Sequence, residues 1–464
     1  MKNAELQIDP RRDELIAQGA EALADALIAL ARRYDPVERV IARLVAKPSK
    51  AVQAIRKEMA KLGTWRNLFH RRDANVAAER MRAVLDDIRA AVQDPEQGTT
   101  LLLQFYQTDA RVFESADDSD GLIGDVYRSD AVALFVAYAK QHPNPTQLAQ
   151  DVLALVASDN YGIRDALTEA AQEYLPDAVI DQIIETHLAI WDAARLALPP
   201  RSANRPYNFD RLPGDLLLRS LAKQRHNAAL FERLILASTP DPGNQYCTEI
   251  AQVYLAAGNP LGATRWLRQI KDISIHSQSD ADQLRIQIAQ AQGDTVERDA
   301  AALREFQRGR SAAAFEALLA IVGEPKRSEL KQSERAAILQ SQQLHVGDVE
   351  FLCEFGFDSD AEAHVLKHAD QLNGRDYFDL PELATTLKKR KRILAATLIW
   401  RALLDDILIN ARLKAYGHGR KYLAALDAAA LTISDWRGVT PHLLYRAELG
   451  ERHARKTSFW RSDA

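Results

Sequence analysis

Apolar residues recur along much of the chain with the 3.6-residue period of a helix that buries one face. Between Asn75 and Val92 the apolar stripe comprises Met81, Val84, Leu85, Ile88 and Val92. Between Asp177 and Leu198 it comprises Ile180, Ile183, Ile184, His187, Leu188 and Trp191. The opposite faces of both segments are charged. The pattern predicts roughly twenty amphipathic helices joined by short connections, as in antiparallel helical pairs.

Helix-start signals precede several of these periodic runs. A capping residue followed by proline stands at Asp35-Pro36, Asp94-Pro95, Asn144-Pro145 and Asp379-Leu380-Pro381. No Asn-Gly, Asp-Gly or Gly-Gly pair lies between alternating runs of Val, Ile and Thr, which is the pattern of a β-hairpin. Only 20 Gly and 17 Pro occur in 464 residues, and Ala and Leu are abundant. The fold is therefore predicted to be all-α.

A degenerate repeat marks the second half of the chain. A glycine ends one helix, an alanine follows, and an apolar residue comes one turn later. The copies are Gly258, Ala263 and Leu267; Gly309, Ala314 and Leu318; Gly356, Ala361 and Val365; and, without glycine, Lys391, Ala396 and Trp400. The glycine can adopt the left-handed conformation that ends a helix, and the small alanine permits close helix packing. We predict an α-solenoid of irregular helix hairpins similar to tetratricopeptide (TPR) repeats.

One connection differs from the others. Residues 199–213 carry four prolines and show no helical period. We therefore expect an N-terminal helical domain over residues 1–198, a proline-rich linker over 199–213 and a TPR-like helical-repeat domain over 214–464.

Charge and cysteine content exclude several classes of protein. The chain has 60 Lys and Arg against 64 Asp and Glu, so its formal net charge is −4. Cys247 and Cys353 are the two cysteines, which excludes a disulfide framework or a cysteine-based zinc site within this chain. The start of the chain is polar, and no apolar run is long enough to span a membrane. We expect a cytoplasmic protein without cofactor, metal or membrane contact.

An acidic turn is the first candidate for chemistry. Asp118 and Asp120 lie in the run Asp117-Asp118-Ser119-Asp120-Gly121. Aligning Gly121 with the sixth position of a calcium loop leaves Ala116 and Tyr127 at the two ends, where oxygen ligands are required. The run is therefore not an EF-hand. We favour a helix-capping turn over a polar binding site.

Basic residues form the second candidate. Lys388, Lys389 and Arg390 open a five-residue basic run that ends at Arg392, and basic residues flank Phe459 and Trp460 in the tail. Basic runs bind phosphate backbones, and nearby aromatic rings can stack on bases. Because the chain as a whole is slightly acidic, a solvated helix junction is favoured over a nucleic-acid site or an acidic protein partner.

Histidines provide no recognisable catalytic or metal site. His364 and His368 are four residues apart, but no third ligand is identifiable, so two exposed histidines on a repeat helix are favoured. His187 is predicted to be a hydrogen-bonded core residue. No phosphate-binding loop, dinucleotide fingerprint, nucleophile elbow or zinc-protease helix occurs in the sequence.

Several segments resemble an uncharacterised family of bacterial all-helical proteins. They are residues 113–126, the turn Asp159-Asn160-Tyr161-Gly162, residues 400–404, residues 414–423 and residues 455–460. Related helical regions accompany SWIM-type zinc fingers in other proteins, but this chain lacks that cysteine-rich module. The resemblance implies an all-α repeat fold with no established activity. Within it, Tyr416 and His418 are expected to anchor a helix or, alternatively, to form a recognition site.

The leading functional hypothesis is a non-enzymatic helical-repeat scaffold that binds a protein or peptide. One alternative is a nucleic-acid-associated protein that uses residues 388–392 and the aromatic tail. A further alternative is an unrecognised hydrolase or metal enzyme that combines Asp118 and Asp120 with a distant histidine. The sequence leaves the partner and the oligomeric state open.

Overall fold

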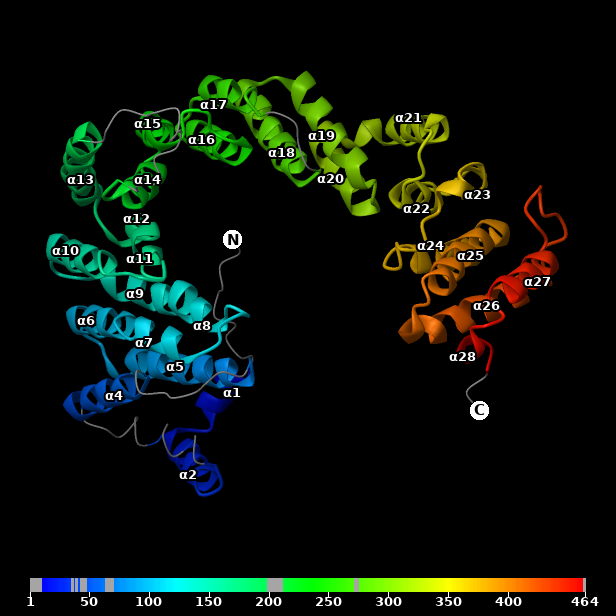
Figure 1. The fold of residues 1–464 in the computed structure, drawn as a ribbon. Coiled ribbons are helices and arrows are strands. Elements are labelled where there is room, and N and C mark those ends of the chain that lie inside the picture. Colours follow the sequence, from blue (N-terminus) through cyan, green and yellow to red (C-terminus); the bar gives the residue numbers. More distant parts are fainter. Residues whose placement is uncertain are drawn as a thin grey trace. The chain divides into compact units, whose positions relative to one another are not determined.

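The computed structural model describes residues 11–34, 48–62, 71–197, 212–270 and 275–461, together with the single positions 37 and 41. Within these ranges every regular element is a helix and none is a strand, which confirms the all-α prediction (Figure 1). None of the described helices has both the length and the apolar composition that a membrane span requires. The helix start expected at Asp35-Pro36 and residues 199–211 of the predicted linker lie outside the described residues.

Two compact units divide the chain, residues 1–242 and residues 243–464. The boundary between the units lies after the predicted linker, because α14 (Asp215–Gln224) packs against α11 (Asp165–Glu169) and α13 (Asp177–Ala197) of the first unit. α15 (Ala228–Ser238) pairs with α14 and therefore belongs to the first unit as well.

The helices before α14 are α1 (Arg12–Ala17), α2 (Ala20–Ala31), α4 (Pro48–Leu62), α5 (Arg71–Ala91), α6 (Pro95–Tyr106), α7 (Asp109–Ser115), α8 (Leu122–Asp125), the π-helical turn η1 (Val126–Ala131), α9 (Val132–Ala139), α10 (Pro145–Val156), α11 (Asp165–Glu169), α12 (Ala171–Tyr174) and α13 (Asp177–Ala197). Two predicted caps are confirmed. Asp94 accepts the amide N–H of Gln97 at 2.8 Å to start α6, and Asn144 accepts that of Gln147 at 3.1 Å to start α10.

The second unit contains α16 (Asn244–Ala256), α17 (Pro260–Leu267), α18 (Ile275–Gln292), α19 (Thr295–Gly309), α20 (Ala312–Val322), η2 (Glu324–Lys326), α21 (Arg327–Gln340), α22 (Val346–Glu354), α23 (Asp358–Lys367), η3 (Ala369–Gln371), α24 (Leu380–Lys389), α25 (Ile393–Ile409), η4 (Leu413–Ala415), α26 (Tyr416–Ala430), α27 (His442–Arg452) and α28 (Thr457–Trp460). Successive helices pack as neighbours, most extensively α16 with α17, α18 with α19, and α25 with α26. α24 begins at Leu380, as the proline pattern predicted, although the side chain of Asp379 makes no cap.

The helix ends explain the repeat. Gly258, Gly356 and Lys391 have φ angles of +71°, +80° and +60°, so each adopts the left-handed conformation. The amide after each of them donates to the carbonyl five residues back, at 2.9, 2.7 and 2.8 Å respectively. This is the Schellman helix ending. The alanines Ala263, Ala361 and Ala396 that follow are fully buried, as a close helix approach requires.

The prediction for Gly309 is wrong by one residue. Gly309 is the last residue of α19, and Arg310 takes the left-handed conformation instead, with a φ of +40°. Ser311 then caps α20 by accepting the N–H of Ala314 at 3.1 Å. The shift places Phe315, and not Ala314, in the fully buried position.

Candidate functional site

A cavity of about 220 Å³ lies beside the start of α26 in the second unit. We call it the His418 pocket. It is lined by Gly374, Tyr377, Leu403, Asp406, Ile407, Arg412, Ala415, His418 and Tyr422. His418 and Tyr422 are one helical turn apart on α26, so their side chains reach the same face. The lining combines apolar and polar groups, as ligand pockets usually do.

Close backbone packing builds the walls of this pocket. A Cβ atom at Gly374 would lie only 2.1 Å from the carbonyl oxygen of Ala402, so the chain before α24 lies directly against α25. Tyr416 is buried, and its ring meets that of Phe459 edge-on, with centroids 5.5 Å apart. Gly419 is also buried, one turn along from Tyr416. The inner face of α26 is therefore fixed, and His418, which is exposed, lines the cavity.

The two ionised residues that line the His418 pocket, Asp406 and Arg412, form an ion pair. Asp406 is its acidic residue, with a side chain that is only 10% exposed. Its carboxylate accepts from Nε of Arg412 at 2.9 Å and from Nδ2 of Asn410 at 2.7 Å. Arg375, which is 70% exposed, approaches the same carboxylate at 3.9 Å. Exposed groups of both signs adjoin the pocket in sequence, Lys414 in the turn before α26 and Asp376 beside Tyr377.

Two exposed aromatic rings stand at the edge of the pocket. Tyr377 and Phe378 are 54% and 78% exposed, and their ring centroids are 4.5 Å apart. Leu413, in the turn before α26, is 67% exposed. Single exposed apolar residues are common on proteins, but several beside a cavity form a patch that marks interaction sites.

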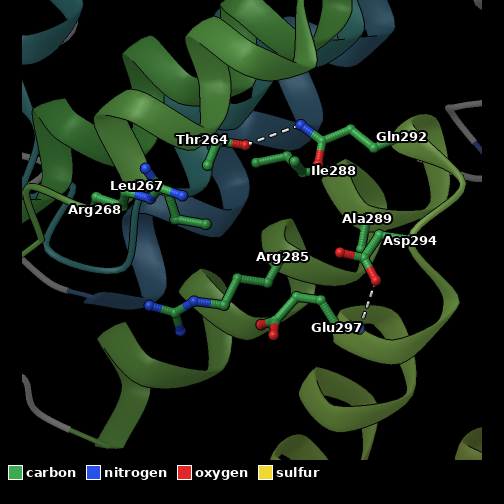
Figure 2. Close-up of a pocket in the computed structure, with 9 residues that line it drawn as sticks. All are labelled: Thr264, Leu267, Arg268, Arg285, Ile288, Ala289, Gln292, Asp294 and Glu297. Atoms are coloured by element: carbon green, nitrogen blue, oxygen red, sulfur yellow. Dashed lines mark hydrogen bonds between the residues drawn. The ribbon is translucent and has the colours of Figure 1, made fainter.

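A second cavity, of about 390 Å³, lies between α17, α18 and the start of α19 (Figure 2). We call it the α17–α19 groove. It is lined by Thr264, Leu267, Arg268, Arg285, Ile288, Ala289, Gln292, Asp294 and Glu297. Our sequence analysis missed it. The available signal was spacing, because residues 285, 288, 289 and 292 share one face of α18.

Both cavities lie within a region that matches a known family. The family model is described as a family of unknown function, DUF6880, and it matches residues 11–462. The chain belongs to DUF6880. No curated protein matches the chain significantly. The match also covers the acidic turn and the basic run, so all the candidate residues of this DUF6880 chain lie inside the family region.

The acidic turn of the DUF6880 chain caps a helix. The two carboxylate oxygens of Asp118 accept the amide N–H groups of Ile123 and Gly124, at 2.8 and 2.9 Å. Gly121 has a φ of +73°, which allows the chain to reverse. Asp120 is exposed in the same turn. Asp118 and Asp120 belong to the first unit, whereas Tyr416 and His418 belong to the second.

The basic run lies at the junction of α24 and α25. Arg390 lies 3.9 Å from the carboxylate of Asp358, and Arg392 lies 3.9 Å from that of Glu362. Lys388 lies over the ring of Trp400, with its Nζ 5.9 Å from the centroid, and Lys389 is exposed. The carboxylates on α23 therefore offset part of the positive charge.

The aromatic residues of the tail pack inward. Phe459 is 1% exposed, and Nε1 of Trp460 donates to the carbonyl of His453 at 3.0 Å. A stacking platform for bases needs open ring faces, and the buried ring of Phe459 does not offer one.

The prediction that His364 and His368 are exposed is wrong. They are 1% and 4% exposed, and their rings lie 4.8 Å apart. Both ring nitrogens of His364 and Nε2 of His368 lack a hydrogen-bond partner among the described residues. Throughout the residues that the structure describes, no group of three or more His, Cys, Asp or Glu side chains is arranged to hold a metal ion.

Proposed function

We propose that this DUF6880 chain is a non-enzymatic helical-repeat scaffold that binds a peptide segment of a partner protein at the His418 pocket. One observation carries the proposal, namely the adjacent and exposed rings of Tyr377 and Phe378 beside a cavity. An apolar side chain of the partner would enter the cavity and contact Leu403 and Ile407. Buried aromatic and aliphatic anchors of this kind dominate the energy of peptide binding.

The charged groups beside the pocket determine which peptides it favours. On the rim of the pocket, Arg375 and Lys414 are exposed next to the lining residues Gly374 and Ala415, while Asp406 is paired with Arg412. An acidic residue beside the apolar anchor would therefore be attracted to the rim, and a basic one would be repelled. The proposal specifies a short acidic peptide with one large apolar side chain.

We also propose that the helix pairs form an α-solenoid of irregular TPR-like hairpins. A left-handed helix ending recurs at His226, Gly258, Gly293, Gly356 and Lys391. In each case the next helix starts within two residues.

We further propose that the protein is cytoplasmic and of bacterial origin. We also propose that it is related to the helical regions that accompany SWIM-type zinc fingers.

A peptide-display selection tests the function. The whole chain is used as bait, and the selected peptides are then titrated by fluorescence polarisation. We expect enrichment of peptides that place Asp or Glu next to Phe, Trp, Leu or Ile. Tyr377→Ala and His418→Ala should each weaken binding about tenfold, which corresponds to about 1.4 kcal/mol.

Leu443→Ala is the matched control, because Leu443 is 80% exposed on α27 and lies outside the pocket. It should bind the selected peptides as the unmodified chain does. Selection of peptides without an acidic residue, or binding that Tyr377→Ala and His418→Ala leave unchanged, would overturn the proposal.

A further inference from the structure

The α17–α19 groove separates opposite charges across an apolar floor. The guanidinium groups of Arg268 and Arg285 lie on one side of the view in Figure 2, and the carboxylate of Asp294 lies on the other. Leu267, Ile288 and Ala289 are buried and form the floor between them. A groove of this kind matches a ligand that carries a negative group at one end, a positive group at the other and apolar groups between.

The arginines on the cationic side have N–H groups that are available to donate hydrogen bonds to a ligand. No described carboxylate forms an ion pair with Arg268, which is exposed at the end of α17. Arg285 donates from Nη1 to the buried carboxylate of Asp282 at 2.7 Å. Since a guanidinium has five N–H donors, this contact leaves Arg285 further donors while holding its side chain in place.

The acidic side is also held in place. Oδ1 of Asp294 accepts the amide N–H of Glu297 at 3.0 Å, which caps α19. Oε1 of Glu297 accepts from Nη2 of Arg304 at 2.8 Å. Asp294 retains a second carboxylate oxygen, whereas the carboxylate of Glu297 extends toward Arg285 (Figure 2). At the far end of the groove, Nε2 of Gln292 donates to Oγ1 of Thr264 at 3.2 Å and links α18 to α17 (Figure 2).

We propose that the α17–α19 groove binds a free tripeptide with apolar side chains. Its terminal carboxylate would lie at Arg268 and Arg285, its terminal ammonium at Asp294, and its side chains on the apolar floor. An extended chain spans about 3.3 Å per residue, so three residues separate the two termini by about 10 Å. In a single amino acid the ammonium and the carboxylate are attached to the same carbon, so they lie much closer together.

The test is calorimetric titration of the whole chain with Ala-Leu-Ala in four forms: free, N-acetylated, C-amidated and blocked at both ends. Charge-assisted hydrogen bonds contribute about 1.5 to 3 kcal/mol, so each block should weaken binding about tenfold or more. Free leucine should bind far more weakly than the free tripeptide.

Two variants assign each end of the peptide to one side of the groove. Arg268→Gln should reduce the difference between the free and the C-amidated peptide, and Asp294→Asn, which keeps the oxygen that caps α19, should abolish the difference between the free and the N-acetylated peptide. Lys421→Gln and Glu451→Gln are matched controls, since both residues are exposed on other helices of the same unit and should leave all four affinities unchanged.

Equal affinity for all four forms, or blocking effects that are undiminished in Arg268→Gln and Asp294→Asn, would overturn this proposal. So would free leucine binding as tightly as the tripeptide. His418→Ala should leave tripeptide binding unchanged. The outcome is therefore separate from that of the peptide selection at the His418 pocket.

Discussion

At the scale of single residues, Arg164 and Asp109 form a buried ion pair with two contacts. Nε and Nη2 of Arg164 donate to the two carboxylate oxygens of Asp109 at 2.8 and 2.7 Å, and the side chains are 7% and 1% exposed. Nη1 of Arg164 donates further to the carbonyl of Leu155 and to Oγ of Ser158. The pair ties α7 to the segment between α10 and α11.

We predict that Arg164→Ala lowers the free energy of unfolding by about 3 to 5 kcal/mol, because it leaves the carboxylate of Asp109 buried without a partner. Urea denaturation followed by circular dichroism at pH 7 measures the change. Arg82→Ala is the control, since the Arg82–Asp130 pair is 45% and 41% exposed and should contribute less than about 1 kcal/mol. Equal losses for both variants would contradict this account.

The buried His364–His368 pair gives a second residue-scale prediction. Burial lowers the pKa of His364, the neighbouring His368 and Lys367 lower it further, and Asp348 raises it. The folded chain therefore keeps His364 neutral at pH values where the unfolded chain protonates it. Stability from this residue is complete above the unfolded pKa of about 6.5 and falls as the pH drops below it.

We expect His364→Leu to reduce the loss of stability between pH 7 and pH 5.5, because leucine does not titrate and leaves no unpaired ring nitrogen. Urea midpoints at the two pH values give the comparison. His345→Gln is the control: His345 is exposed at the start of α22, so its removal should leave the pH dependence unchanged. An unchanged pH dependence in His364→Leu would show that His364 is not its source.

At the scale of elements, the helix ends were partly readable from the sequence. The glycine repeat identified Gly258 and Gly356 correctly, and its fourth copy identified Lys391. It missed the same ending at His226 and Gly293, and it placed Gly309 one residue too early. A local pattern cannot decide which of two adjacent residues ends a helix when the choice depends on which side chain the next helix buries. Here that side chain is Phe315.

Three glycines test this view of the helix ends. Gly356→Ala should cost about 1 kcal/mol, because Gly356 has a φ of +80°. Gly309→Ala should be neutral or slightly stabilising, since Gly309 is helical and has open space around its Cβ position. Gly347→Ala should cost about 1 to 3 kcal/mol, because its Cβ would lie 2.4 Å from the carbonyl oxygen of Gly309. Thermal unfolding compares the three, and a loss in Gly309→Ala as large as that in Gly356→Ala would refute the assignment of Gly309.

At the scale of the whole molecule, the described residues contain two clusters of buried apolar side chains. One lies within the first unit and includes Phe105, Tyr127 and Leu221, and the other lies within the second and includes Phe306 and Trp400. The participation of Leu221 explains why α14 belongs to the first unit although it follows the proline-rich segment. Proline content signals a break in helical structure, whereas burial decides which core a helix joins.

We therefore expect two separable transitions when the full chain unfolds in differential scanning calorimetry. Arg164→Ala should lower one transition temperature, and Gly356→Ala should lower the other. Leu443→Ala, at an exposed position, should change neither. A single transition that both destabilising variants lower together would show that the two cores unfold as one.

The sequence alone determined the helical class, because apolar period, caps and the scarcity of hairpin signals are local properties of the chain. It also singled out His418, but it did not predict which residues lie around that side chain. Tertiary structure alone brought Tyr377, Asp406 and His418 around one pocket, and buried His364 against the prediction of exposure. Both outcomes depend on contacts between residues distant in sequence, and the 3.6-residue period carries no information about which helix packs against which face.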